Sequence, residues 1–344
     1  MSASNLSYRG FLLRFRNLAK IALDNYGIKD YELKFISYRG NGMYRVDVKG
    51  KNDVSIPQGR YTLRLHQPNY MNPIYISSEM EWLFALNEAG VDVPRPYKNQ
   101  DGQWITVADI GFEVPQARNC TLISWMEGRF VKKPRPKHFK SLGKIVGRMH
   151  QQSVHWKKPN GFKRPHWDWE GLFGDGFDYG VPAKEARAAI PKKHQEIFQR
   201  TLNLVEEAQN QLGKGRKVFG LIHADLAIGE NMVFRAGEPL VFDFDDCGFG
   251  YWAFDLGVLL ANYILDFEFP QHEMQEALIE GYQETSPFTD SNLEYLDLFI
   301  AARLAQLMFF YQGSAVLRPE VVNEVNVEIT GCAELLKHIL KRMI

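Results

Sequence analysis

The sequence predicts an α+β protein with two lobes: a small N-terminal lobe built on an antiparallel sheet with one main helix, and a larger, mostly helical C-terminal lobe. Three observations lead to this prediction. Apolar and polar residues alternate in several stretches of the first third, which is typical of strands with one buried face. Later in the chain, apolar residues recur at helical spacing. Between the two parts, residues 126–136 are rich in glycine, proline and basic residues, as expected of an interlobe linker.

The N-terminal lobe is expected to contain three antiparallel strands between two helices. Helical patterns cover residues 11–26 and 76–89, and a glycine follows each of them. Gly40-Asn41-Gly42 marks the turn between the first two strands, and a further strand is expected at 121–125. The alternating apolar residues of the three strands are Tyr31, Leu33 and Phe35, then Tyr44, Val46 and Val48, then Tyr61, Leu63 and Leu65.

The C-terminal lobe should be helical apart from one short strand and a hairpin. Apolar residues at helical spacing fill 138–150 and 193–212, and helices again dominate from residue 252 to the end. A short apolar strand is expected at 218–222, and a hairpin around Ala236-Gly237. The chain is therefore divided into a first lobe at 1–125, a hinge at 126–136 and a second lobe at 137–344.

The composition favours a globular protein that stays in solution. The 344 residues are 45% hydrophobic and 24% charged, which is enough to bury the cores of two lobes. A formal net charge of +0 gives no bulk attraction to nucleic acid or to a membrane surface. The first ten residues lack the apolar core of a signal peptide. Three well-separated cysteines, Cys120, Cys247 and Cys332, favour a reducing, cytoplasmic setting without disulfides or structural zinc.

Acidic residues follow directly after the short strands of the C-terminal lobe. His223-Ala224-Asp225 comes after the strand at 218–222, Asn231 lies six residues beyond Asp225, and Asp243 follows the hairpin. Phosphoryl transfer needs a carboxylate to orient and deprotonate an acceptor hydroxyl, and oxygen ligands to hold Mg²⁺ on the nucleotide. One aspartate after a strand is often only a turn residue. The joint pattern instead predicts Asp225 as the catalytic base, and Asp243 together with a residue near Asn231 as metal ligands.

This segment resembles the catalytic and metal-binding loops of the aminoglycoside phosphotransferase and choline kinase-like family. The resemblance covers most of the chain and is strongest over residues 221–260. It implies a protein-kinase-like fold, ATP and Mg²⁺ as cofactors, and a small-molecule hydroxyl as the phosphate acceptor. It also implies that Asp255, within Phe254-Asp255-Leu256, braces the catalytic loop. We expect His223 to have a structural role in holding the same loop.

The resemblance extends to the first lobe, which would bind the nucleotide. The strand Tyr61-Thr62-Leu63-Arg64-Leu65 is similar to the third strand of the family, where a basic residue meets the nucleotide phosphates. Alternation independently places Arg64 opposite the apolar face of that strand. Glu79 is the expected partner of Arg64, with Glu81 as the rival. Either charge could instead be solvated.

Two further nucleotide contacts are implied. Gly40 and Gly42 lie where a loop would cover the phosphates, although two glycines also suit a plain hairpin turn. The segment from Ser124 to Gly128 resembles the hinge, in which the backbone of Ser124 and Met126 would bind adenine. Any interlobe linker would need similar flexibility.

The chain departs from the family pattern at two positions. The spacing from Asp225 to Asn231 is six residues where the family usually has five. Either Gly229 lets the loop bulge so that Asn231 still reaches the metal, or Glu230 replaces it; we favour Asn231. Arg64 stands where kinases generally have lysine, so the charge is kept but its geometry differs.

The acceptor is the least determined part of the prediction. A set of acids and aromatic rings could favour a cationic amino alcohol such as homoserine, choline, ethanolamine or an aminoglycoside. We nevertheless favour the explanation that most of these acids are surface charges and that the rings belong to the core. A sugar or a protein hydroxyl stays open. So do a nucleotide-binding pseudokinase, a protein Ser/Thr kinase and, ranked lower, a metal-dependent phosphohydrolase; the oligomeric state is not predicted. The acids are Asp245, Asp246, Glu268 and Glu284, and the rings are Tyr251, Trp252 and Tyr263.

Overall fold

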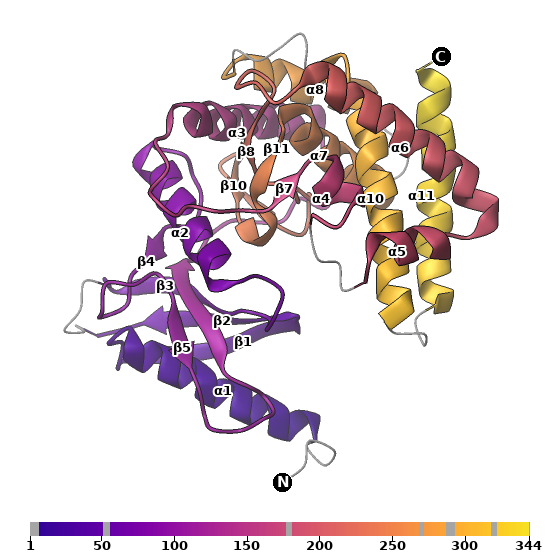
Figure 1. Ribbon diagram of the computed structural model, residues 1–344. Helices are drawn as coiled ribbons and strands as arrows, with labels where there is room; N and C mark the ends of the chain where they lie inside the picture. Colours follow the sequence, from indigo (N-terminus) through magenta and orange to yellow (C-terminus); the bar gives the residue numbers. More distant parts are fainter. Residues whose placement is uncertain are drawn as a thin grey trace. The chain divides into compact units, whose positions relative to one another are not determined.

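The computed structural model describes residues 7–50, 56–176, 181–267, 272–286, 293–317 and 322–343. The chain forms two compact units (Figure 1). The N-terminal unit consists of residues 1–127 and 158–163, and the C-terminal unit of residues 128–157 and 164–344. The hinge at 126–136 stays a prediction.

The N-terminal unit is built on an antiparallel sheet, as predicted. The strand order is β1-β2-β3-β6-β4, with β5 paired to β6. The three predicted strands are the first three of this order, and their register pairs Leu33 with Val46 and Tyr44 with Leu63. The strands are β1 (Tyr31–Arg39), β2 (Asn41–Val48), β3 (Gly59–Leu65), β4 (Pro96–Tyr97), β5 (Thr106–Ala108) and β6 (Arg118–Ser124).

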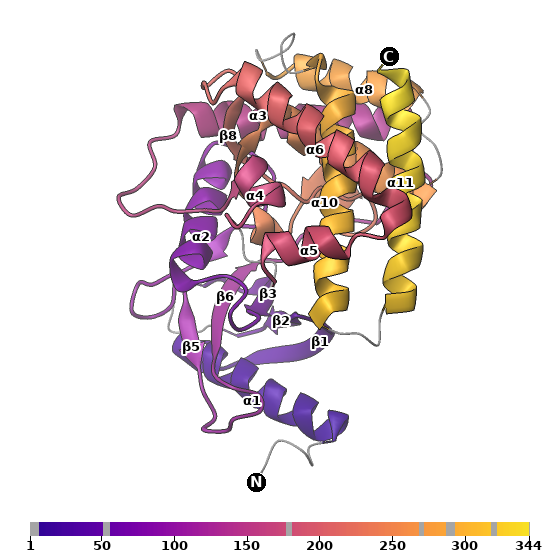
Figure 2. The same ribbon diagram turned by 45° about the vertical axis from the view of Figure 1, so that its right-hand side comes forward.

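Two helices belong to this sheet, α1 (Tyr8–Asn25) and α2 (Pro73–Glu88). The first runs along one face of the sheet in both views (Figures 1 and 2). Its apolar side joins Leu63 and Leu65 of β3 in one buried core. Because side chains alternate along a strand, Arg64 points to the opposite face, where it meets α2.

Short strands in the C-terminal unit carry the predicted catalytic segment. A three-stranded sheet has the order β7-β11-β8, and β9 pairs with β10 in the predicted hairpin. Ala236 and Gly237 at its tip have φ values of 53° and 92°, and positive φ at both central residues is what a type I′ hairpin turn requires. The strands are β7 (His166–Trp167), β8 (Phe219–Ile222), β9 (Met232–Arg235), β10 (Glu238–Val241) and β11 (Gly248–Tyr251).

Helices make up the rest of the C-terminal unit, as predicted. One group pairs α3 (Pro136–His155) with α8 (His272–Gln283). In the other, α10 (Leu296–Leu317) packs against α7 (Trp252–Phe267), α6 (Lys192–Leu212), α5 (Ala183–Ala189) and α11 (Val322–Arg342), while α4 (Trp169–Phe173) contacts α6 (Figure 2). Among the described helices, none is long and apolar enough to cross a membrane.

Candidate active site

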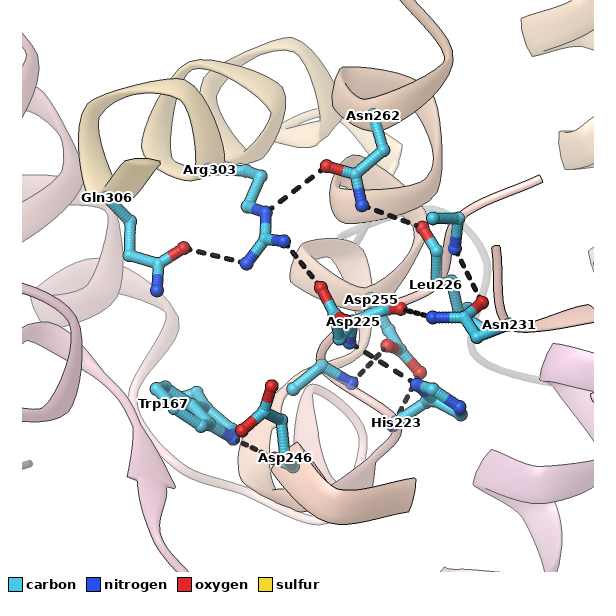
Figure 3. A network of polar contacts seen from close by, with 12 residues as sticks. Trp167, His223, Asp225, Leu226, Asn231, Asp246, Asp255, Asn262, Arg303 and Gln306 are labelled. Carbon is cyan, nitrogen blue, oxygen red and sulfur yellow. Dashed lines mark hydrogen bonds and ion pairs between the residues drawn. The ribbon is translucent and has the colours of Figure 1, made fainter. Parts of the chain in front are cut away.

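The loop that carries Asp225 leaves β8 and is fixed from below by Asp255 at the start of α7 (Figure 3). The backbone N–H groups of His223 and Ala224 donate to Oδ2 and Oδ1 of Asp255, at 3.0 and 2.8 Å. Ala224 adopts a left-handed conformation with φ of 68°, which turns the chain sharply before Asp225. These bonds are those expected of the bracing role that the resemblance implies.

The bracing residue, Asp255, is itself buried and paired with His150. Nε2 of His150 lies 3.0 Å from Oδ2 of Asp255, and Nδ1 of His150 lies 2.9 Å from the hydroxyl of Tyr282. Burial alone would raise the pKa of Asp255. The hydrogen bond and charge of His150, with the contribution of His223, outweigh burial and hold that pKa below its ordinary value.

His223 joins the two loops that carry the predicted catalytic and metal-binding aspartates. Its Nε2 lies 3.1 Å from the carbonyl of Phe242, and its Nδ1 accepts from the N–H of Asp225 at 3.3 Å. The ring also packs against Phe244. With both ring nitrogens engaged, His223 positions the loops, as we expected.

The segment from Asp225 to Asn231, with its six-residue spacing, forms a compact turn. Asn231 donates from Nδ2 to the carbonyl of Asp225, and its Oδ1 accepts from the N–H of Ala227 at 2.8 Å. Gly229 has φ of 96°, a conformation that glycine adopts without strain, so the extra residue is accommodated there. An amide oxygen has two lone pairs, so Oδ1 keeps one for a metal ion. That role stays a prediction.

The hairpin register brings Asn231 next to the segment that starts with Asp243. Met232 pairs with Val241, and the N–H of Phe242 donates to the carbonyl of Asn231 at 2.9 Å. Asp243 follows immediately, is exposed, and has φ of 66°. Within the described residues, no group of three or more His, Cys, Asp or Glu side chains is arranged to hold a metal. One carboxylate and one amide, however, are ligand types that suit Mg²⁺.

In the N-terminal unit, Arg64 pairs with Glu79. Nη1 of Arg64 lies 2.9 Å from Oε1 of Glu79, and the two side chains are 1% and 0% exposed. The solvated alternative is therefore wrong for both residues. Glu81 has a different environment, where burial raises its pKa and the charge of Lys98 opposes that rise. The phosphate contact of Arg64 stays a prediction.

The glycine turn has a packing explanation. Gly40 has φ of 86° and lies against the side chain of Gln67. The backbone N–H of Gln67 donates to Oδ1 of Asn41 at 2.8 Å. A Cβ on Gly42 would overlap the ring of Phe15 from α1. Close approach of α1 therefore requires glycine at position 42, and the phosphate contact stays a prediction for both glycines.

The two predicted hinge residues differ in what their backbones do. The N–H of Ser124 donates to the carbonyl of Arg95, and its hydroxyl accepts from the N–H of Arg95, both at 2.8 Å. Met126 is half-buried, and its N–H and C=O make no hydrogen bond within the described part of the chain. Of the two, Met126 is the residue whose backbone could serve adenine.

One residue of the site was not predicted. Nη2 of Arg303, on α10, lies 2.6 Å from Oδ1 of Asp225 (Figure 3). The pair is separated by 78 positions, so no local motif contains it. The available signal was a single charged residue, Arg303, in the mostly apolar stretch 298–309.

The three aromatic rings and Glu284, which were considered for the acceptor, have other packing or ion-pair partners. The side chains of Tyr251 and Trp252 are buried in the core, and the ring of Tyr263 packs edge-on against Phe139. Glu284 pairs with two lysines of α3, Lys140 and Lys144. Glu268 lies outside the described residues. The aromatic wall is therefore wrong, because hydrophobic burial has drawn these rings into the core.

The sequence of the chain can be compared directly with the family that its motifs resemble. Residues 49–290 match the model of the phosphotransferase enzyme family, which covers more than half of the chain. The chain belongs to this family. The predicted resemblance is thereby confirmed.

Individual proteins agree with this assignment. The chain is 28% identical to homoserine kinase of Agrobacterium fabrum over 230 residues, which span 65% of this chain and 64% of that protein. The chain is also 26% identical to amicoumacin kinase of Bacillus subtilis over 251 residues, which span 70% of this chain and 66% of that protein.

Solved structures share the fold. The microcompartment-associated aminopropanol kinase has a TM-score of 0.78 at 25% identity, with 94% of this chain and 97% of that chain covered. The amicoumacin kinase hAmiN in complex with AMP-PNP, Ca²⁺ and Ami has a TM-score of 0.72 at 20% identity, with 97% and 95% covered. The predicted kinase-like α+β fold is confirmed.

Proposed function

We propose that this protein is an ATP- and Mg²⁺-dependent kinase that transfers the γ-phosphate to a hydroxyl group of a small amino alcohol. The observation that carries the proposal is the catalytic loop. Asp255 holds its backbone from a fully buried position, while the side chain of Asp225 keeps 33% exposure. A rigid loop that presents one partly exposed carboxylate is what a general base for an alcohol needs.

Each residue of the site then has a defined task. Asp225 accepts a hydrogen bond from the acceptor hydroxyl and takes its proton late, since phosphoryl transfer has a loose transition state. Asp243 and Asn231 provide the oxygen ligands for Mg²⁺, which neutralises charge on the phosphates when bound. Arg64, oriented by Glu79, contributes positive charge to the nucleotide phosphates, and the backbone of Met126 binds adenine.

The amino alcohol is inferred from the relatives. Homoserine and aminopropanol, the substrates in the names of two similar proteins, each combine a primary amine with a hydroxyl. Neither relative is similar enough to transfer its substrate to this chain directly. The shared chemistry supports the class, and the individual acceptor is left to the assay.

The test is a coupled ADP-release assay on the full chain with MgATP. The panel pairs each amino alcohol with a diol or hydroxy acid that lacks the amine: aminopropanol with propanediol, and homoserine with 4-hydroxybutyrate. We expect at least one amine to stimulate turnover above its matched partner, and Asp225→Asn to lower the stimulated turnover by at least about 10²-fold.

Three results would contradict the proposal. Nucleotide binding without turnover on any acceptor would indicate a pseudokinase. Phosphorylation of peptides alone would indicate a protein kinase. Equal turnover with the amine and its matched partner would exclude the amino alcohol class while leaving the kinase in place.

A further inference from the structure

The carboxylate of Asp225 is held by a cation from a distant helix. Nη2 of Arg303 lies 2.6 Å from Oδ1 of Asp225, and the side chains are 11% and 33% exposed. The arginine is therefore the inner member of the pair, and the carboxylate faces outward from it. Charge-assisted hydrogen bonds of this length are among the stronger ones in proteins.

The guanidinium is fixed on its other sides as well. Nη1 donates to Oε1 of Gln306 at 2.8 Å, one turn further along α10. Nε donates to Oδ1 of Asn262 on α7, at 3.4 Å (Figure 3). Each nitrogen of the planar group thus has its own acceptor, which sets the orientation of the guanidinium plane.

The backbone of the catalytic loop does not need Arg303. Asp255 holds residues 223 and 224, Asn231 holds the carbonyl of Asp225, and Asn262 donates to the carbonyl of Leu226 at 3.0 Å. Within the loop, Arg303 itself contacts only the side chain of Asp225. Removing Arg303 should release the carboxylate while the loop stays in place.

We propose that Arg303 is a positioning residue that fixes Oδ1 of Asp225, so that Oδ2 is the oxygen presented to the acceptor hydroxyl. The inference rests on the proposed role of Asp225 as the base. Gln306 and Asn262 hold Arg303 in the orientation that this requires. A misplacement of about 1 Å in such a group can lower turnover by about 10²-fold.

Steady-state kinetics with the best acceptor test the inference. We compare the wild type, Arg303→Ala, Arg303→Lys and a control, Arg200→Ala, at an exposed arginine of α6. In Arg303→Ala, kcat should fall on the order of 10²-fold, whereas KM for ATP should stay at the wild-type value. Added ethylguanidinium should restore part of the kcat of Arg303→Ala. It should leave the kcat of the control, Arg200→Ala, unchanged.

The variants separate positioning from other roles. A lysine cannot make the three-sided contact, so Arg303→Lys should recover only a small part of kcat. An unchanged kcat in Arg303→Ala would overturn the proposal, and so would a loss without guanidinium rescue. If Arg303→Ala does not fold, Gln306→Ala replaces it, with a smaller loss of kcat expected and an unchanged kcat again overturning the proposal.

A second measurement needs no acceptor. In crystals of Arg303→Ala, the carboxylate of Asp225 should leave its wild-type rotamer while the backbone of residues 223–231 stays unchanged. An unchanged rotamer would overturn the inference even if the enzyme proves inactive on every acceptor. An inactive wild type with a changed rotamer would contradict the proposed function alone.

Discussion

Asp255 and His150 form a fully buried pair, with Nε2 of His150 3.0 Å from Oδ2 of Asp255. The same carboxylate receives the N–H groups that begin the catalytic loop. One buried charge therefore links α7, α3 and the loop of Asp225. The stability of the C-terminal unit and the geometry of the candidate site depend on the same residue.

This pair predicts a pH dependence of stability. The pKa of Asp255 is depressed in the folded protein, so its charge stabilises the fold above the ordinary aspartate pKa. That contribution is lost as the pH falls through the lower folded value. Asp255→Asn should lower the free energy of unfolding by about 2 kcal/mol at pH 7, since hydrogen bonds to a charged group are lost.

The measurement is urea unfolding at pH 7 and at several values below the ordinary aspartate pKa. The difference between wild type and Asp255→Asn should shrink as the pH falls. The exposed Asp101→Asn provides the control and should show no such difference. A gap that stays constant over this pH range would contradict the depressed pKa of Asp255.

Asp225→Asn should separate chemistry from binding. Asparagine retains an oxygen for Arg303 but cannot take the proton of the acceptor hydroxyl. General-base assistance contributes about 10²–10⁴ in rate, so turnover should fall by at least about 10². Isothermal titration with MgATP should give the wild-type affinity. Near-full turnover would remove Asp225 from the role of base.

Much of the fold could be predicted because its signals are local. The hairpin at Ala236-Gly237 depends on two neighbouring residues with positive φ, and alternation alone placed Arg64 opposite the apolar face of its strand. The strand β11 was missed, because Gly-Phe-Gly-Tyr is short, has no apolar–polar alternation and contains two glycines, which are uncommon in strands. It becomes a strand by pairing with β8 on one side, from Gly248–Ile222 to Tyr251–Phe219, and with β7 on the other.

The residues of the candidate site also divide into those that a local motif predicts and those that depend on contacts with distant elements. Asp225, Asn231 and Asp243 could be proposed as site residues because they lie within one short segment of the chain. Arg303 could not be identified, because helical spacing places an arginine on α10 without saying what it meets. Gly42 shows the converse: the motif was visible, but the ring of Phe15 that requires it comes from another element.

The buried pair of Arg64 and Glu79 predicts separate effects on stability and on nucleotide binding. Glu79→Gln removes the countercharge of a buried arginine and should cost about 3–5 kcal/mol in urea unfolding. The double variant Arg64→Met/Glu79→Leu removes both charges and should recover much of that stability. It should nevertheless raise KM for ATP. An unchanged KM in the double variant would exclude Arg64 from the phosphate contact.

Gly42→Ala should act through packing. The added methyl would overlap the ring of Phe15, and overpacking typically costs about 1–3 kcal/mol. Urea unfolding should show this loss, and Phe15→Leu in the same chain should reduce it by making room. If Gly42→Ala keeps its stability but binds ATP poorly, the nucleotide rather than α1 would be the reason for this glycine.

Calorimetric titrations of three variants, with and without Mg²⁺, distinguish between the candidate metal ligands. Asp243→Ala should lose the Mg²⁺-dependent part of nucleotide binding, because the carboxylate is the only charged ligand proposed. Asn231→Ala should weaken it as well, and should also loosen the turn that Asn231 closes onto Asp225 and Ala227. Glu230→Ala changes an exposed side chain and should leave the Mg²⁺ dependence intact. The reverse order, with Glu230→Ala losing the metal and Asn231→Ala keeping it, would assign the ligand to Glu230 and leave Asn231 with its structural role alone.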